Sequence, residues 1–126
     1  MTKASIATTK YQVRLENGRH VFGADEPVEQ GGLDSAPTPD ELLEAALASC
    51  TAITLRMYAD RKQWPVESID VEVALERTDG KTVFSRNIHL KGKLDQEQKD
   101  RLLQIAKLCP VSKTLTGSIE VNSSIQ

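Results

Sequence analysis

The chain contains two cysteines, Cys50 and Cys109, and a pair of thiols is the chemistry that this sequence most plainly offers. A thiolate is a nucleophile toward peroxides, and the sulfenic acid that it forms can be converted to a disulfide by a second thiol. If the fold brings the two cysteines together, one can attack a peroxide and the other can resolve the oxidised sulfur. Their separation along the chain leaves that meeting as a hypothesis.

Each cysteine also has a purely structural interpretation. Cys50 lies within the apolar run from Leu42 to Ile53, where an unmodified cysteine serves as a small buried hydrophobe. Cys109 precedes Pro110, so it is expected to be the N-cap of a short helix. A thiolate there is stabilised by free backbone N–H groups and the positive helix end, and Lys113 adds a charge one turn on. The alternative is that Cys109 only lies at the helix end and has no chemical role.

A long helix is predicted to carry Cys50. Thr38 is expected to be the N-cap, with Pro39 at the first helical position and Glu41 closing a capping box. No Gly or Pro follows until after Gln63. The stretch around Cys50 is apolar nearly all round, which is typical of a helix buried on most sides. Because this is more apolar surface than one sheet face requires, we expect a second subunit to cover part of it.

Short alternating runs predict two antiparallel hairpins. Asn17-Gly18 is a strong turn signal between Tyr11–Glu16 and Arg19–Phe22, and Asp79-Gly80 is a second one between Ile69–Leu75 and Val83–Leu90. In a two-residue turn at Asn17-Gly18, Val13 faces Phe22 and Leu15 faces His20. Arg14, Glu16, Arg19 and Val21 then share the opposite face.

The remaining elements complete an α+β fold. Asp95 is the expected N-cap of a second helix with Gln98 at its third position, Val111 to Leu115 suits a further helical turn, and Ser118 to Asn122 suits a last strand. Helices between separated hairpins indicate α+β architecture with antiparallel strands. We expect one domain over residues 1–126, with residues 1–10 flexible.

Composition excludes several classes of function. The net charge is −2 and the basic residues form no stripe, which argues against a nucleic-acid partner. There is no run of apolar residues long enough for a membrane helix and no apolar leader at the start, so a cytoplasmic protein is expected, where structural disulfides are rare. His20 and His89 have no ligand cluster around them, so no metal is expected, and no glycine-rich motif for a cofactor occurs.

Two motifs resemble those of one family. The stretch from Thr38 to Ala52, TPDELLEAALASCTA, resembles the central-helix motif of the OsmC/Ohr family, the osmotically inducible and organic hydroperoxide resistance proteins. CPVSKTL, from Cys109 to Leu115, is similar to the second-cysteine motif of that family, and Gly31-Gly32 ahead of Pro39 also matches. The order of elements agrees over about residues 11–123.

The resemblance implies an intertwined homodimer with two antiparallel sheets around long buried central helices. It also implies active sites at the dimer interface that reduce organic hydroperoxides, with Cys50 as the peroxidatic and Cys109 as the resolving cysteine. A dithiol reductant is expected by analogy, and no cofactor is needed.

The family also places an acid and an arginine beside the reactive cysteine. The acid is usually a glutamate ten residues before it, where this chain has Asp40, followed by Glu41. Both acids also suit the helix dipole. The arginine, which lowers the pKa of the thiol and polarises the peroxide, is placed near the first hairpin. Arg19 is the closest positional match, Arg14 the second, and Arg56 a third candidate on the long helix itself.

Three functions therefore compete. The first is a thiol-dependent peroxidase acting on organic hydroperoxides. The second is a non-catalytic stress protein of the same fold that binds a small apolar ligand in the dimer cleft. The third is an acyl-transfer or hydrolytic use of Cys50, which needs a general base that neither motif supplies.

Overall fold

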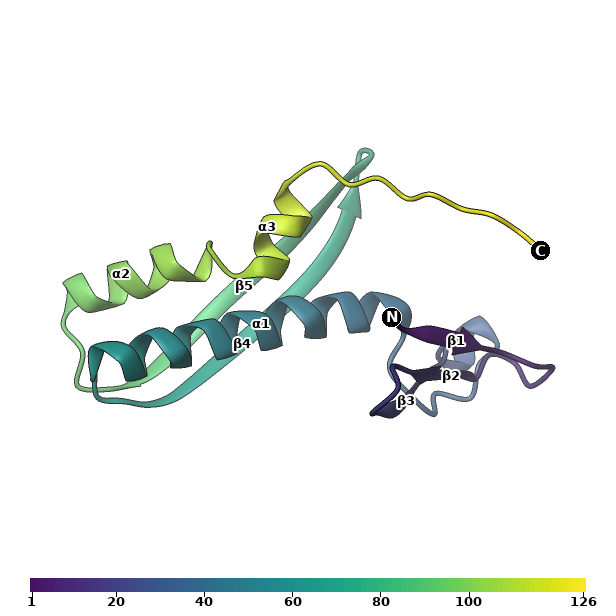
Figure 1. The fold of residues 1–126 in the computed structure, drawn as a ribbon, viewed down its shortest axis with the longest axis horizontal. Helices are drawn as coiled ribbons and strands as arrows, with labels where there is room; N and C mark the ends of the chain where they lie inside the picture. Colours follow the sequence, from purple (N-terminus) through teal and green to yellow (C-terminus); the bar gives the residue numbers. More distant parts are fainter. The chain divides into compact units, whose positions relative to one another are not determined.

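The computed structural model describes residues 1–126, and its contacts divide the chain into two units, Met1–Leu43 and Glu44–Gln126. Each unit is described by itself. The elements in chain order are β1 (Lys3–Ser5), β2 (Val13–Glu16), β3 (Val21–Ala24), the 3-10 turn η1 (Val28–Gln30), α1 (Pro39–Lys62), β4 (Val66–Thr78), β5 (Lys81–Gly92), α2 (Gln96–Ala106) and α3 (Pro110–Thr116). Figure 1 shows them in sequence colours. The α+β class with antiparallel strands is confirmed.

The first unit contains a three-stranded antiparallel sheet in the order β1-β2-β3. The predicted hairpin is present, but its register was wrong. Leu15 pairs with Phe22 and Glu16 with Val21, so four residues connect the strands instead of two. The Asn17 carboxamide oxygen accepts hydrogen bonds from the backbone N–H groups of Arg19 and His20, at 3.1 and 2.9 Å. This side-chain turn competes with the two-residue turn that Asn-Gly usually forms.

The register shift has two further consequences. Arg19 and His20 lie in the connection and not on a strand, and both are exposed, whereas the sequence predicted that His20 faces Leu15. The first ten residues also include a strand that the sequence did not indicate, since Lys3 pairs with Glu16 and Ser5 with Arg14.

Asp25 organises the loop that follows β3. Its carboxylate is buried and accepts four hydrogen bonds, from the backbone N–H groups of Tyr11, Glu26 and Ser35 and from the Ser35 hydroxyl. The Gly31-Gly32 pair is needed here. Gly31 has a φ of 91°, and a Cβ on Gly32 would lie 2.0 Å from the Glu26 carbonyl oxygen. Only glycine permits both the left-handed turn and this close approach.

Helix α1 begins and ends as the sequence predicts. Thr38 N donates to the Glu41 carboxylate and Glu41 N donates to the Thr38 hydroxyl, both at 3.1 Å, which completes the capping box. At the other end Gln63 has a φ of 58°, and Trp64 N donates to the Ala59 carbonyl. A left-handed residue just after the helix, followed by a backbone N–H that bonds back to the last helical turn, is the Schellman motif.

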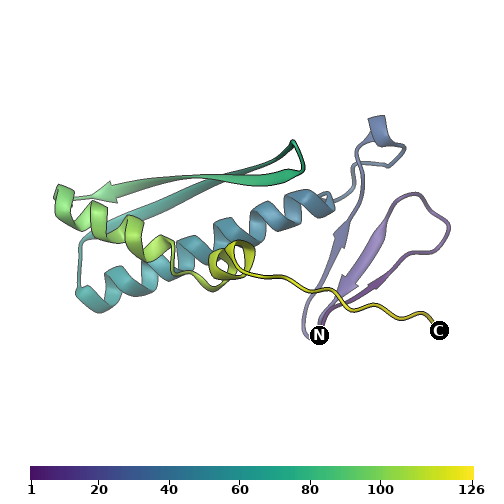
Figure 2. The same ribbon diagram turned by 90° about the horizontal axis from the view of Figure 1, so that it is seen from above.

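The second unit consists of the β4–β5 hairpin and the helices on one of its faces (Figures 1 and 2). The two-residue turn at Asp79 and Gly80 is confirmed, because Thr78 pairs with Lys81 and both turn residues have positive φ, 50° and 73°. Two adjacent positive φ angles are the signature of the type I′ turn, whose twist suits a hairpin.

The core of this unit lies where α1 and α2 meet the hairpin. Its fully buried centre consists of Leu55 and Ala59 from α1 with Leu102 and Ala106 from α2. Aliphatic side chains of both strands pack against it, among them Ile69, Ile88 and Leu90. The buried centre is aliphatic, and Tyr58 and Trp64 pack against it.

Helix α1 buries one face and leaves another uncovered. Leu47, Thr51, Leu55 and Ala59, four residues apart, are buried. Ala46, Ile53 and Met57 lie on a different face and are exposed, with Cys50 between them. By length and mean hydropathy α1 could also cross a membrane, which the composition had argued against, but a core helix of a soluble protein passes the same test.

The helices after β5 follow the sequence, whereas the predicted last strand is wrong. Asp95 and Gln98 form the second capping box, and Cys109 is the N-cap of α3 with Pro110 at the first helical position. Residues 117–126 form no strand and leave α3 as an extended segment (Figure 1).

Candidate functional site

The fold of the second unit brings the two cysteines together. Cys50 comes from the middle of α1 and Cys109 from the start of α3, and Cys50 lies near enough to be one of the groups that lower the pKa of the Cys109 thiol. Both are free thiols. Cys109 is completely buried and Cys50 is partly exposed, so Cys50 is the residue of the pair with solvent-accessible surface.

Cys109 sits among groups that stabilise a negative sulfur. Its Sγ accepts a hydrogen bond from Ser112 N at 3.3 Å and lies 3.8 Å from the hydroxyl oxygen of Thr51. Burial raises the pKa of the Cys109 thiol, but the Ser112 N–H, the neighbouring Cys50 and Thr51 side chains and the charge of Arg86 together lower it below its ordinary value of 9.0. These are the hydrogen-bonding and charge effects that favour a thiolate.

Arg86 is a site residue that the sequence analysis missed. It lies on β5, and its Nη1 donates to the Thr51 hydroxyl at 3.0 Å and to the Ala106 carbonyl at 3.2 Å. These two bonds hold the guanidinium between α1 and α2, next to Cys109. Arg86 therefore supplies a positive charge to the cysteine pair from within the second unit.

A sequence signal for Arg86 does exist. Phe84, Ile88 and Leu90 alternate along β5 and are all partly buried. Arg86 occupies the same alternation, so it is a cation on the apolar face of a strand. Such a residue needs a polar partner, and here the partners come from two helices that lie far away in the sequence.

A hollow of about 380 Å³ lies beside these groups. Four apolar side chains line it together with Arg86 and Ser112, namely Leu47, Phe84, Leu103 and Leu115. Neither cysteine lines it.

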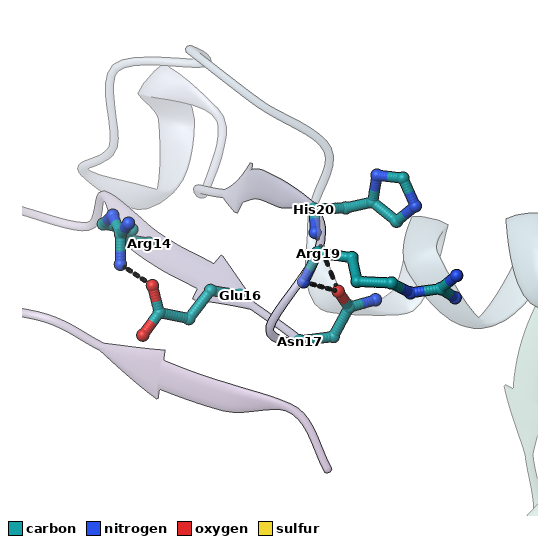
Figure 3. Close-up of polar contacts among 5 residues, drawn as sticks. All are labelled: Arg14, Glu16, Asn17, Arg19 and His20. Carbon is teal, nitrogen blue, oxygen red and sulfur yellow. Dashed lines mark hydrogen bonds and ion pairs between the residues drawn. The ribbon is translucent and has the colours of Figure 1, made fainter.

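The two arginines proposed near the first hairpin lie in the first unit (Figure 3). Arg14 is paired with the carboxylate of Glu16, two residues along the same strand. Arg19 follows the Asn17-Gly18 turn, and its guanidinium extends away from the Arg14–Glu16 pair. Their action on Cys50 therefore stays a prediction, with Arg19 the less engaged of the two.

The remaining candidates have specific positions. Asp40 and Glu41 lie in the first turn of α1, where the Glu41 carboxylate is engaged by the capping box. Arg56 donates to the Val66 carbonyl at 2.8 Å and pairs with Asp60 at 3.5 Å. It is thereby committed to the junction of α1 and β4.

Fold and site together define a small α+β protein with two neighbouring free thiols, of which Cys109 lies among groups that favour its thiolate. A family model described as OsmC-like protein matches residues 32–124. The chain belongs to the OsmC-like family, as its two cysteine motifs predict.

Solved structures agree with this fold. An organic hydroperoxide resistance protein OsmC from Legionella pneumophila is 27% identical with a TM-score of 0.68, over 93% of this chain and 88% of that one. An OsmC-like protein from Mycoplasma pneumoniae is 18% identical with a TM-score of 0.77, over 93% and 86%. The organic hydroperoxide resistance protein OhrB of Bacillus subtilis is 22% identical with a TM-score of 0.63, over 93% and 90%. A search of curated proteins gave no match.

Proposed function

We propose that this protein is a cytoplasmic thiol-dependent peroxidase that reduces organic hydroperoxides through Cys50 and Cys109. The observation that carries the proposal is the neighbouring pair of free thiols, in which Cys50 is partly exposed and Cys109 is buried beside the Ser112 N–H. The naming of similar structures as organic hydroperoxide resistance proteins supports the substrate class.

The reaction balances with these two residues and an external dithiol. The Cys50 thiolate attacks the outer oxygen of the hydroperoxide, so that the O–O bond breaks, the alcohol leaves and Cys50 becomes a sulfenic acid. The Cys109 sulfur then attacks the oxidised Cys50 sulfur, which releases water and forms a disulfide. A dithiol reductant returns both cysteines to thiols and is itself oxidised to a disulfide.

Arg19 and Asp40 are proposed to complete the site around Cys50. A guanidinium near Cys50 favours its thiolate and polarises the peroxide, and a carboxylate orients that guanidinium. Arg19 has no ion-pair partner such as Glu16 provides for Arg14. Asp40 takes the place of the usual glutamate, because Glu41 is used by the capping box.

A homodimer is part of the proposal. The stripe formed by Ala46, Cys50, Ile53 and Met57 follows the spacing of one helical face and remains largely uncovered by the second unit. Ile53 is 55% and Met57 61% exposed, so this stripe offers apolar surface that a partner could cover. A second subunit over this stripe would place Cys50 at the interface.

The test is a thiol count after one equivalent of cumene hydroperoxide. The reduced protein should lose two thiols per chain within seconds and show an intramolecular Cys50–Cys109 disulfide by mass. Cys50→Ser should lose none, and Ser49→Ala, a change at the neighbouring helix position, should behave as the parent protein. Thiols that stay reduced for minutes would overturn the proposal.

That result would favour a second candidate, a non-catalytic member of the family that binds a small apolar ligand. The hollow lined by Leu47, Phe84, Leu103 and Leu115, and by four polar residues, could hold the apolar part of such a ligand. An apolar probe dye whose fluorescence rises with the reduced protein, and is lost in Leu103→Glu, would support this alternative.

A further inference from the structure

Arg86 and Thr51 are hydrogen-bonded to each other beside the buried cysteine, Cys109. Arg86 Nη1 donates to Thr51 Oγ1 at 3.0 Å and to the Ala106 carbonyl at 3.2 Å, which ties β5 to both α1 and α2. Thr51 is fully buried, and its hydroxyl oxygen lies 3.8 Å from Cys109 Sγ. A charged side chain with two such bonds keeps one position, so its field acts on Cys109 before any reaction occurs.

The two sulfurs are therefore unequal in a way that matters for disulfide exchange. Cys109 is 0% exposed, its Sγ accepts the Ser112 N–H, and it lies 3.8 Å from the Thr51 hydroxyl oxygen and within reach of the charge of Arg86. Cys50 is partly exposed. In exchange, the attacking thiolate needs an accessible sulfur, and the sulfur whose thiolate is better stabilised leaves faster. The exposure of Cys50 and the stabilised thiolate of Cys109 therefore favour the same direction, in which the reductant attacks Cys50 and Cys109 leaves.

We propose that Arg86 and Thr51 are positioning residues that fix the direction of disulfide reduction, so that the reducing dithiol attacks Cys50 and Cys109 leaves as the thiolate. The inference rests on the proposed function for the existence of the Cys50–Cys109 disulfide in the working cycle.

The step balances as follows. One thiolate of the dithiol forms a bond to Cys50 Sγ, the Cys50–Cys109 bond breaks, and the electron pair goes to Cys109 Sγ. The second thiol of the dithiol then displaces Cys50 from the mixed disulfide and closes an intramolecular disulfide in the reductant. Two electrons and two protons pass from the dithiol to the protein.

Thr51 has a specific part in this step. Its hydroxyl has one hydrogen, which it donates to the Leu47 carbonyl at 2.7 Å while it accepts from Arg86. When Cys109 leaves as a thiolate, the hydroxyl hydrogen can rotate from Leu47 to the sulfur while the bond from Arg86 is kept. The Thr51 hydroxyl thus becomes a hydrogen-bond donor to Cys109 Sγ when the negative charge develops on that sulfur.

The experiment starts from a disulfide made with diamide, so it does not depend on turnover with peroxide. The oxidised protein is mixed with excess glutathione, quenched with acid, alkylated and mapped by peptide mass. Glutathione should be found on Cys50 and the alkyl label on Cys109. Arg86→Gln should open the disulfide about tenfold more slowly and Thr51→Val several-fold more slowly, because the leaving thiolate is less stabilised. Arg86→Lys should recover part of the rate.

A control and a second measurement separate this role from simple loss of structure. Arg101→Gln removes an exposed arginine of the same unit, bonded to Tyr58 and Gln104, and should open at the parent rate. In the Cys50→Ser background, Arg86→Gln should move the ultraviolet titration of the Cys109 thiolate to higher pH, which a general packing defect would not do.

Glutathione on Cys109, unchanged opening in Arg86→Gln, or failure of diamide to form the Cys50–Cys109 disulfide would each overturn the inference. A protein that passes this test yet keeps its thiols with cumene hydroperoxide would refute the peroxidase and leave the polarity of exchange established.

Discussion

The guanidinium of Arg86 is held 3.0 Å from the hydroxyl oxygen of Thr51, the residue directly after Cys50 in α1. This contact joins strand β5 to the helix that carries the partly exposed thiol, beside the buried thiol of Cys109. Thr51 is fully buried and the preceding residue, Cys50, is partly exposed, so two consecutive residues of α1 lie beside the buried Cys109.

The first prediction concerns the two hairpin arginines. Arg19→Ala should slow the oxidation of Cys50 by cumene hydroperoxide by about tenfold or more, because a cation that activates the thiol is lost. Arg14→Ala should change the rate little, since its guanidinium is paired with Glu16. Stopped-flow thiol loss under excess peroxide gives both rates. A larger loss in Arg14→Ala than in Arg19→Ala would reverse the assignment.

The second prediction concerns the acid sensitivity of the first unit. The hydrogen bonds from the Ser35 hydroxyl, outweighing the opposing effect of burial, and those from the backbone of Ser35, Glu26 and Tyr11, hold the pKa of Asp25 well below its ordinary value of 3.8. A depressed folded pKa means that the stabilisation is complete above the unfolded pKa and is lost as pH falls below it toward the folded value.

Asp25→Asn should remove that pH dependence and should destabilise the unit at neutral pH, since the amide group cannot accept all four bonds. Hydrogen exchange of the Glu26 and Ser35 amides, whose N–H groups bond to this carboxylate, reports it directly. Equal protection of both amides in Asp25→Asn and the parent protein would show that the carboxylate does not hold this loop.

The third prediction tests the core of the second unit. Leu55 is 0% exposed and packs at the centre of the cluster with Leu102 and Ala106. Leu55→Ala should lower the free energy of unfolding by about 2–5 kcal/mol, because it removes buried methyl groups and leaves a cavity. Denaturant unfolding followed by Trp64 fluorescence measures it. The matched change Leu43→Ala, at a 43% exposed position of the same helix, should cost much less.

The fourth prediction concerns the uncovered stripe on α1. If the proposed dimer forms over this stripe, Ile53→Glu should shift the protein to monomer in sedimentation equilibrium, because it places a charge in the proposed apolar interface. Lys62→Glu, which changes an exposed residue at the end of the same helix, should leave the mass unchanged. A parent protein that sediments as a monomer at all concentrations would remove the dimer from the account.

Local signals in the sequence predicted local structure well. The Thr38–Glu41 and Asp95–Gln98 capping boxes, the Asp79-Gly80 turn and Cys109 as an N-cap all depend on residues within four positions of each other. The Asn17-Gly18 hairpin failed in register because the Asn17 side chain bonds to two later N–H groups, a choice that the dipeptide alone does not reveal.

Features that depend on distant partners were harder to predict. Ser118 to Asn122 alternates like a strand, yet it has no partner in this chain. Arg86 was missed because its meaning comes from Thr51, 35 residues earlier, and from Ala106, 20 residues later. The cysteine pair was found through two family motifs. The spacing of Cys50 and Cys109 along the chain does not by itself predict whether the two thiols lie close together in the fold.

The most direct test of the account is where the first oxidation occurs. Cys109→Ser, treated with one equivalent of cumene hydroperoxide in the presence of dimedone, should carry the sulfenic-acid adduct on Cys50, and Cys50→Ser under the same conditions should carry none. An adduct on Cys109 in Cys50→Ser at the same rate, or no adduct on Cys50 in Cys109→Ser, would contradict the assignment of Cys50 as the attacking thiol.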